Sequence, residues 1–270
     1  MFVPRPFLIA LCLCLPLETV AAQNTAGIDP EALIERILAV EQTQREQLED
    51  VTFDAEYVER EDKGDEGFVE KVRLVKTVYL KYVEDTVWYA EQYLDYYKDG
   101  ELRSEEELQK EAKDRKDKKA KRKAQDISYP ILKPFLPEQR AIYELEYLGV
   151  ADERIDDLVC HHFRVSAKEP ADSLINGDYY FEAEYFHLVR VDFSPSKLIS
   201  KLMFKLKALD MSIRYEPTAE GFWLPRQFDV RGRGKAAFFI GVKFAGTEYY
   251  RNPQINTELD DSIFEVADGN

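Results

Sequence analysis

Side chains able to do acid–base or metal chemistry are few in this sequence. Its histidines are His161, His162 and His187. Successive residues on a strand point to opposite faces, so we do not expect His161 and His162 to bind one metal ion. The acidic pairs Asp156–Asp157 and Asp260–Asp261 have the composition of a paired-carboxylate site. Both pairs lie in predicted turns, where solvent exposure is the simpler interpretation.

Motifs of the common enzyme classes are absent from the sequence. It contains no GxSxG, HExxH or CxxC motif, and the glycines of "GRGKAAFF" lack the spacing of a phosphate-binding loop. We therefore predict no catalytic residue, no metal, no cofactor and no enzymatic activity. An envelope hydrolase is the weakest of the function classes considered.

The first residues predict export from the cytoplasm. An apolar run, Phe7–Leu17, is followed by Val20 and Ala22, whose spacing suits signal peptidase. The run is shorter than the about 20 residues that a membrane span needs. We predict a signal peptide of residues 1–22, cleaved before Gln23, and a soluble protein in the periplasm.

Charge and cysteine content narrow the class of protein further. The formal net charge is −15, whereas nucleic-acid binding needs clustered Lys and Arg, so we expect no nucleic-acid partner. One basic tract, Lys110–Lys123, also contains acidic residues and is interpreted as a solvated helix. Transient contact of this tract with an anionic membrane surface is a second interpretation. Cys160 is the one cysteine outside the signal segment, so we expect no disulfide within the mature chain.

After the signal segment the pattern predicts one helix and then many strands. Asp29 is a plausible N-cap before Pro30, and apolar residues recur at helical spacing as far as Leu48. Alternation then predicts an antiparallel meander of three long strands, closed by a hairpin signal at Asp99–Gly100. Strands resume at Ala141, and we expect about nine or ten in total.

A charged insertion interrupts the strands. Ser104 and Glu107 form a capping box, and a helix with almost no apolar residues follows, so about 104–126 is predicted to be an exposed helix or lid stalk. The segment "YPILKPFLPEQ" is apolar but broken by prolines. It either caps a cavity or packs on the core.

The strand "VWYAEQYLDYY", Val87–Tyr97, is apolar on both faces. Exposed apolar area costs roughly 25 cal/mol per Å², so each face needs a cover. The N-terminal helix can cover one face, and the other can curve into a barrel or half-barrel around an apolar cavity. Period-two alternation predicts these cavity-lining, ligand-binding residues: Phe53, Tyr57, Leu74, Val78, Leu80, Trp88, Leu94, Phe204 and Leu206.

Several stretches resemble one bacterial family. They are "YYFEAEYFHLVRVDF", "GFWLPRQFDV" and the ending "NPQINTELDDSIFEV". In this order, after a signal peptide and an amphipathic helix, they resemble the LolA/LolB superfamily of outer-membrane lipoprotein-sorting proteins. The most specific piece is Asn256–Phe264, because the family closes with an acidic pair and a Phe that docks on the sheet.

The resemblance implies a mainly β (α+β) fold, an unclosed antiparallel β-barrel or half-barrel capped by helices. It implies one lipid-binding domain, residues 23–270, whose hydrophobic interior binds lipid or lipoprotein acyl chains during periplasmic transport. Envelope membrane proteins are the further partners that it suggests. Family carriers hold a lid closed with a cavity Arg, and only Lys81 falls near that position. The alternative is an envelope sensor or adaptor on the same fold that binds a lipid or protein without transport.

Overall fold

The computed structural model describes residues 28–84, 86–121, 131–198, 200–201, 204–236 and 240–264. The predicted signal peptide, residues 1–22, and its cleavage before Gln23 lie outside these residues. The last residues of the predicted insertion, 122–126, lie outside them as well.

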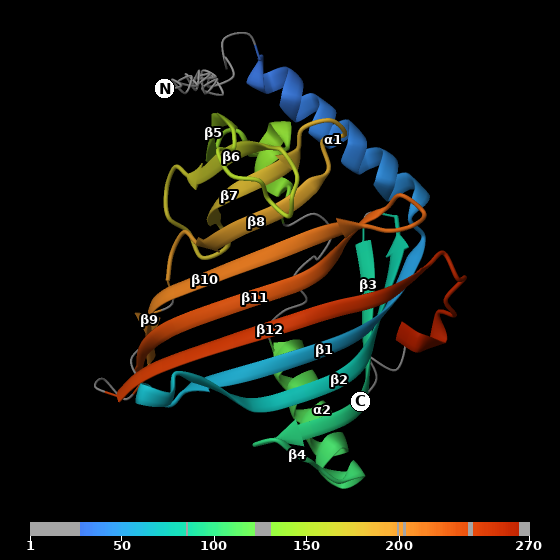
Figure 1. Ribbon diagram of the computed structural model, residues 1–270, viewed down its shortest axis with the longest axis vertical. Helices are drawn as coiled ribbons and strands as arrows, with labels where there is room; N and C mark the ends of the chain where they lie inside the picture. The colour runs from blue at the N-terminus through green and yellow to red at the C-terminus, as the bar shows by residue number, and fades with distance from the viewer. Residues whose placement is uncertain are drawn as a thin grey trace, which may run out of the picture.

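One large antiparallel sheet makes up most of the fold (Figure 1). Its strands are β1 (Asp50–Asp62), β2 (Phe68–Val83), β3 (Thr86–Lys98), β4 (Glu101–Leu102), β5 (Tyr143–Val150), β6 (Cys160–Ala167), β7 (Ile175–Glu182), β8 (Leu188–Pro195), β9 (Ser200–Lys201), β10 (Phe204–Pro217), β11 (Trp223–Ala236) and β12 (Ile240–Ile255). The helices are α1 (Pro30–Gln47) and α2 (Glu105–Lys121), with short 3-10 turns η1 (Gly64–Glu66), η2 (Lys133–Phe135) and η3 (Pro137–Gln139).

The strand order is β4-β3-β2-β1-β12-β11-β10-β8-β7-β6-β5, with β9 paired to β10. Among the described residues the end strands β4 and β5 do not pair, so the sheet is bent but not closed. The predicted class, a mainly β unclosed antiparallel barrel with helical caps, is confirmed. So is the meander of β1, β2 and β3, and its hairpin, where Asp99 and Gly100 take φ values of 53° and 82°.

The structure has twelve strands where about nine or ten were predicted. Two of them, β4 and β9, have only two residues each. The sequence of residues 177–194 predicts one strand, but a turn in which Phe186 has a φ of 66° divides it into two. The Glu182 carboxylate accepts hydrogen bonds from the backbone N–H groups of Glu184 and Tyr185, which stabilises this turn.

The helix α1 begins as predicted. The Asp29 carboxylate accepts a hydrogen bond from the Glu31 N–H at 3.0 Å. Its apolar face, Leu33, Ile34 and Ile37, is buried against the sheet end formed by β5–β8. No helix of the described residues is long and apolar enough to cross a bilayer.

The proline-broken segment packs on the core, which is the second of the two expected arrangements. Phe135 is fully buried, and its ring lies 5.1 Å from the ring of Tyr179 and 5.4 Å from that of Phe181. The Tyr179 hydroxyl donates to the carbonyl of Ile131 at 2.8 Å. This loop therefore fills the β5–β8 end of the sheet from the same side as α1.

The prediction that α2 is an exposed helix needs a correction. Its capping box forms, with Glu107 N–H donating to Ser104 Oγ and Ser104 N–H donating to Glu107 Oε2, both at 3.3 Å. Most of its side chains are exposed, but Leu108 is only 4% exposed and packs with residues of β2 and β3. Arg115 also docks the helix, because it pairs with Glu59 at 3.7 Å and lies over the Tyr57 ring.

The C-terminal segment is fastened to the sheet, as the resemblance implies. Asp50 is buried, and its carboxylate accepts from the N–H of Thr257 at 2.8 Å and of Leu259 at 3.1 Å. The predicted docking of Phe264 is confirmed: it is 6% exposed, and its ring lies 5.9 Å from that of Trp88.

Candidate binding surface on the inner face of the sheet

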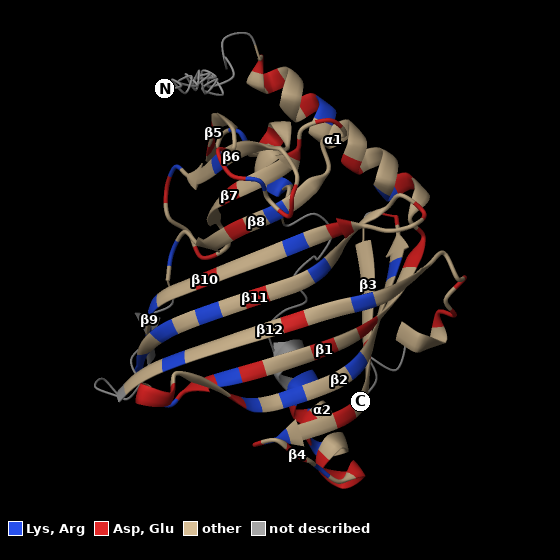
Figure 2. Ribbon diagram, viewed as in Figure 1, with Lys and Arg blue, Asp and Glu red and all other residues tan. Residues whose placement is uncertain are grey.

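The two faces of the sheet differ in chemistry. We call inner the face that carries Phe53 and Leu74 at one end and Val191 at the other, and on which α2 and the 131–139 loop lie. In Figure 1 both of these segments lie behind the sheet. The opposite, outer face shows alternating acidic and basic positions along β10, β11, β12 and β1 (Figure 2). A binding surface for an apolar ligand must therefore lie on the inner face.

The inner face is filled by the protein itself at the β1–β3 end. Phe53, Leu74 and Val78 share this face, as predicted, but each is only 1% exposed. Tyr57 and Leu80 lie on the same face and are half-buried. Leu206, on β10, is also on the inner face and 6% exposed.

Two of the predicted cavity residues are misplaced. Trp88 pairs in register with Lys81 on the outer face and packs against Phe264 instead. Leu94 is 47% exposed, because a β-bulge at this position breaks the alternation of β3 and moves Tyr96 to the inner face opposite Leu74. The side chain of Phe204 lies outside the described residues.

A buried ionic cluster lies on the inner face where β1, β2, β3 and β12 meet. The Lys76 ammonium forms ion pairs with the carboxylates of Glu91 and Glu248, the second at 2.6 Å. The side chains are 6%, 12% and 14% exposed, respectively. The hydroxyls of Tyr89 and Tyr93 both donate to Glu91. We call Lys76, Glu91 and Glu248 the lysine cluster.

In the lysine cluster, burial and the neighbouring carboxylates shift the pKa of Lys76 in opposite directions. Burial alone would lower the pKa of Lys76, but Glu248 and Glu91 together raise it above its usual value. Burial, with these carboxylates adding to it, raises the pKa of Tyr89 well above its usual value. The ammonium is therefore charged and the phenol neutral over the physiological range, and both are held in place.

Lys81, the residue nearest to the family's cavity arginine in sequence, does not enter the interior. It donates to the carbonyl of Leu259 at 2.6 Å and pairs with Asp261 at 2.5 Å on the outer face. Its role is to fasten the C-terminal segment. The buried cation of the inner face is Lys76, five residues earlier.

The other end of the inner face is closed by α1 and the 131–139 loop. Phe163, Tyr179 and Val191 are fully buried beneath them. Burial also raises the pKa of the Glu41 carboxyl on α1 to about 7. The inner face is therefore more deeply buried at this end of the sheet than in its middle.

Between the two filled ends, the middle of the inner face is only half covered. Cross-strand register places apolar side chains in adjacent rows there, and each is partly exposed: Phe193, Leu209, Met211, Ile213, Phe228, Val230, Val242 and Phe244. Glycines at Gly177, Gly232 and Gly234 lie in the same rows. At Gly232 a Cβ atom would come within 2.1 Å of the Phe244 ring, so this ring can lie flat on β11 only because glycine is there.

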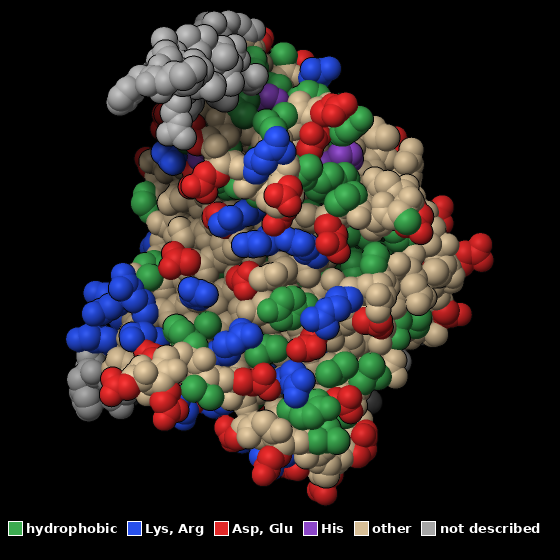
Figure 3. Space-filling model, viewed as in Figure 1, with side chains coloured by type: hydrophobic (Ala, Val, Ile, Leu, Met, Phe, Trp, Pro, Cys, Tyr) green, Lys and Arg blue, Asp and Glu red, His purple; other side chains and the backbone are tan. Residues whose placement is uncertain are grey.

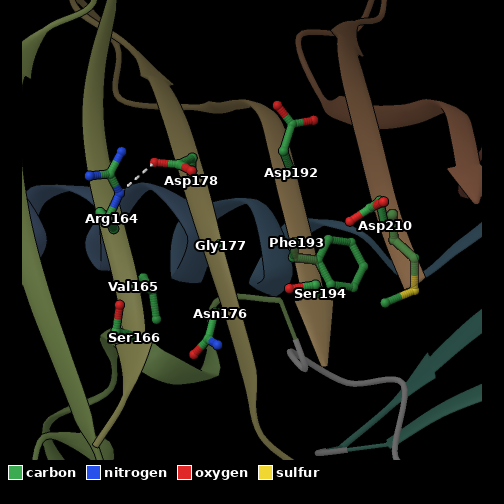
Figure 4. A pocket seen from close by; sticks show the side chains of 11 residues that line it. Arg164, Val165, Ser166, Asn176, Gly177, Asp178, Asp192, Phe193, Ser194 and Asp210 are labelled. Atoms are coloured by element: carbon green, nitrogen blue, oxygen red, sulfur yellow. Dashed lines mark hydrogen bonds and ion pairs between the residues drawn. The ribbon is translucent and has the colours of Figure 1, made fainter. Parts of the chain in front are cut away.

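The sheet separates at one edge of this middle surface. Strands β8 and β10 pair only through Met211–Arg214, and the earlier residues of β10 have no partner in β8. A groove of about 320 Å³ lies at this separation, with Val165, Gly177, Phe193 and Met211 on its inner side. Figure 4 shows the Phe193 side chain projecting from β8 toward β10.

Polar groups line the outer rim of this groove. Arg164 pairs with Asp178 at 3.1 Å (Figure 4). Asp192 pairs with Arg190 at 2.7 Å. The groove lining therefore combines apolar residues such as Phe193 and Met211 with charged residues on the outer face.

The histidines and the cysteine are accounted for by packing. His161 contacts the Tyr147 hydroxyl at 2.9 Å, whereas His162 contacts Asp178 at 2.8 Å, so the two point to opposite faces as predicted. Cys160 is a buried free thiol, and burial, with Glu182 and Asp156 adding to it, raises its pKa to about 12. Among the described residues no cluster of three metal-ligating side chains occurs.

Sequence reasoning missed both the middle surface and the lysine cluster. Lys76 was visible as a break in an apolar face, and Glu91 as an acid between tyrosines. Their meeting with Glu248 is a long-range contact that no local pattern reveals. The glycine positions of β11, next to alternating Phe228 and Val230, were the available signal for the middle surface.

Comparisons with solved structures return proteins of low sequence identity to this chain. A DUF1329 family protein from Desulfovibrio piger has 13% identity and a TM-score of 0.45, over 88% of this chain and 98% of that one. An outer membrane lipoprotein-sorting protein domain from Vibrio parahaemolyticus has 9% identity and a TM-score of 0.45, over 87% and 99%. A LolA superfamily protein from Nitrosomonas europaea has 10% identity and a TM-score of 0.35, over 84% and 96%.

No family model and no curated protein matches the sequence. The similarity to these solved structures is limited to the path of the backbone. It identifies no ligand for this protein.

Proposed function

We propose that the protein is a periplasmic carrier that binds acyl chains of lipids or lipoproteins on the middle of the inner face, for sorting to the outer membrane. In this proposal residues 23–270 act as one lipid-binding domain and catalyse no reaction. The observation that supports it is the half-covered apolar surface in the middle of the inner face, between the two more deeply buried ends of the sheet.

The energy of acyl burial fits such a surface. Each buried methylene contributes about 0.8 kcal/mol, so ten of them contribute about 8 kcal/mol before the costs of association. A dissociation constant of about 1 μM needs a net free energy of about 8 kcal/mol, so a bound chain must bury more than ten methylenes to offset the costs of association as well.

Met211→Glu is expected to lower the affinity for a fluorescent fatty-acid probe at least about tenfold, because a carboxylate in the middle of the inner face must be desolvated beneath the chain. Fluorescence titration measures this effect. Met211 lies between Phe193 and Val230 in register and lines the groove.

Two variants serve as controls. Met211→Leu keeps the surface apolar and should bind the probe like the wild type. Ala208→Glu places the same carboxylate on the outer face of β10, opposite Arg233, and should also bind normally. If folded Met211→Glu binds the fatty-acid probe as tightly as the wild type, the acyl chain does not bind on the middle of the inner face.

The second candidate is an adaptor that binds a protein or lipid without transport. The observation that favours it is α2, where most of the described charged side chains are exposed while Leu108 and Arg115 hold the helix on the sheet. A wild type that binds no acyl probe would favour the adaptor over the carrier.

A further inference from the structure

A group of basic side chains lies on the outer face where β10, β11 and β12 approach their connecting turns. Its members are Lys205, Lys207, Arg231, Arg233, Lys235 and Lys243, and each is exposed. In Figure 3 Lys and Arg side chains gather at the left edge, where these strands end. We call these six residues the basic patch.

The patch lies on a strongly acidic chain. The formal net charge of the protein is −15. Two carboxylates offset part of its charge: Asp62 pairs with Lys243 at 2.5 Å, and Asp210 faces Arg231 in register. The other patch residues form no ion pair with a carboxylate of the described chain.

Like charges face one another across the strands of the patch. Lys205 lies opposite Lys235, and Arg233 lies opposite Lys243. Such directly opposed like-charged pairs destabilise a sheet. Folding stability therefore does not explain the patch, and binding of an anionic partner does.

The extent of the patch indicates what kind of anionic partner fits. Its six cations are spread over three neighbouring strands on one face of the sheet. A surface that carries many anionic headgroups matches such a broad array of cations, and each Lys or Arg near it adds to the attraction. Charge complementarity over this area therefore favours a bilayer surface.

We propose that the basic patch docks the protein on a bilayer surface that carries anionic phospholipid headgroups. The patch lies on the face opposite the proposed acyl-binding surface, so the two proposals can fail separately. Docking through it would bring the β8–β10 groove, at the adjoining strands, close to lipid.

The test is flotation of the full mature chain with vesicles of phosphatidylcholine, alone or mixed with phosphatidylglycerol. Wild type should float with the mixed vesicles at low ionic strength and be released by added salt, which screens exposed charges. Each Lys or Arg near such a surface changes partitioning about fivefold, so Lys205→Gln, Arg233→Gln and Lys235→Gln together should lower it about a hundredfold.

The matched control removes three other exposed lysines, as Lys98→Gln, Lys133→Gln and Lys168→Gln. It changes the net charge equally and should float like wild type. The patch variant should also melt no lower than wild type, because its like-charged pairs are gone. Equal flotation of patch variant and control would overturn the proposal, as would wild type that ignores the mixed vesicles, which would leave an acidic protein as partner.

Discussion

Replacing Lys76 by methionine should lower the free energy of unfolding by about 3–5 kcal/mol, as breaking a buried ion pair does. The variant leaves the carboxylates of Glu91 and Glu248 facing each other without their shared cation, and both are nearly buried. Urea denaturation of the wild type and the variant measures the difference.

The loss should depend on pH. Without the ammonium, one of the two carboxyls should take up a proton in the folded state, so its folded pKa rises above its unfolded value. Between these two pKa values the folded state binds more protons, so its stability falls as pH rises. The variant should therefore lose more stability at about pH 8 than at about pH 5.

A triple variant separates charge from packing. Lys76→Met with Glu91→Gln and Glu248→Gln removes all three charges, so it should be more stable than Lys76→Met alone at about pH 8. If the single and triple variants are equally unstable at both pH values, the cluster contributes by shape rather than by charge.

The second large effect is expected at the C-terminal segment. Phe264→Ala should lower the free energy of unfolding by about 3–5 kcal/mol, as is typical when a buried aromatic is truncated. Phe264 is 6% exposed and covers Trp88 on the outer face. Truncation before Leu259 should cost at least as much, since it also removes the partners of Lys81.

Ile263→Ala is the matched control, since this neighbouring side chain is only half-buried. Its effect on the midpoint of thermal unfolding should be clearly smaller than that of Phe264→Ala. A truncated protein with the melting temperature of the wild type would contradict the view that the segment fastens the sheet edge.

How far the sequence predicts this fold depends on the range of the interactions involved. Local signals succeeded: the caps at Asp29 and Ser104, the turn at Asp99–Gly100 and the shared face of Phe53 and Val78. These depend on neighbours within a few residues, or on strict alternation. The C-terminal docking of Phe264 came from the family resemblance rather than from local chemistry.

The side chains of the inner face were predicted less well, for physical reasons. A single bulge at Leu94 reversed the faces of β3, which alternation alone cannot detect. Alternation predicts which residues share a face of the sheet, but not whether other parts of the protein cover that face. The predicted face of Phe53 and Leu74 was therefore right, but both side chains are buried beneath other side chains. The lysine cluster needs Glu248 from a strand almost 160 residues away along the chain from Glu91.

The most direct test of acyl binding is native mass spectrometry of the protein purified from its own envelope without detergent. We expect a bound mass of a lipid or lipoprotein acyl chain on the wild type, which is lost in Met211→Glu and retained in Ala208→Glu. A folded, gently extracted wild type whose only observed mass is that of its own polypeptide would contradict the proposed acyl binding.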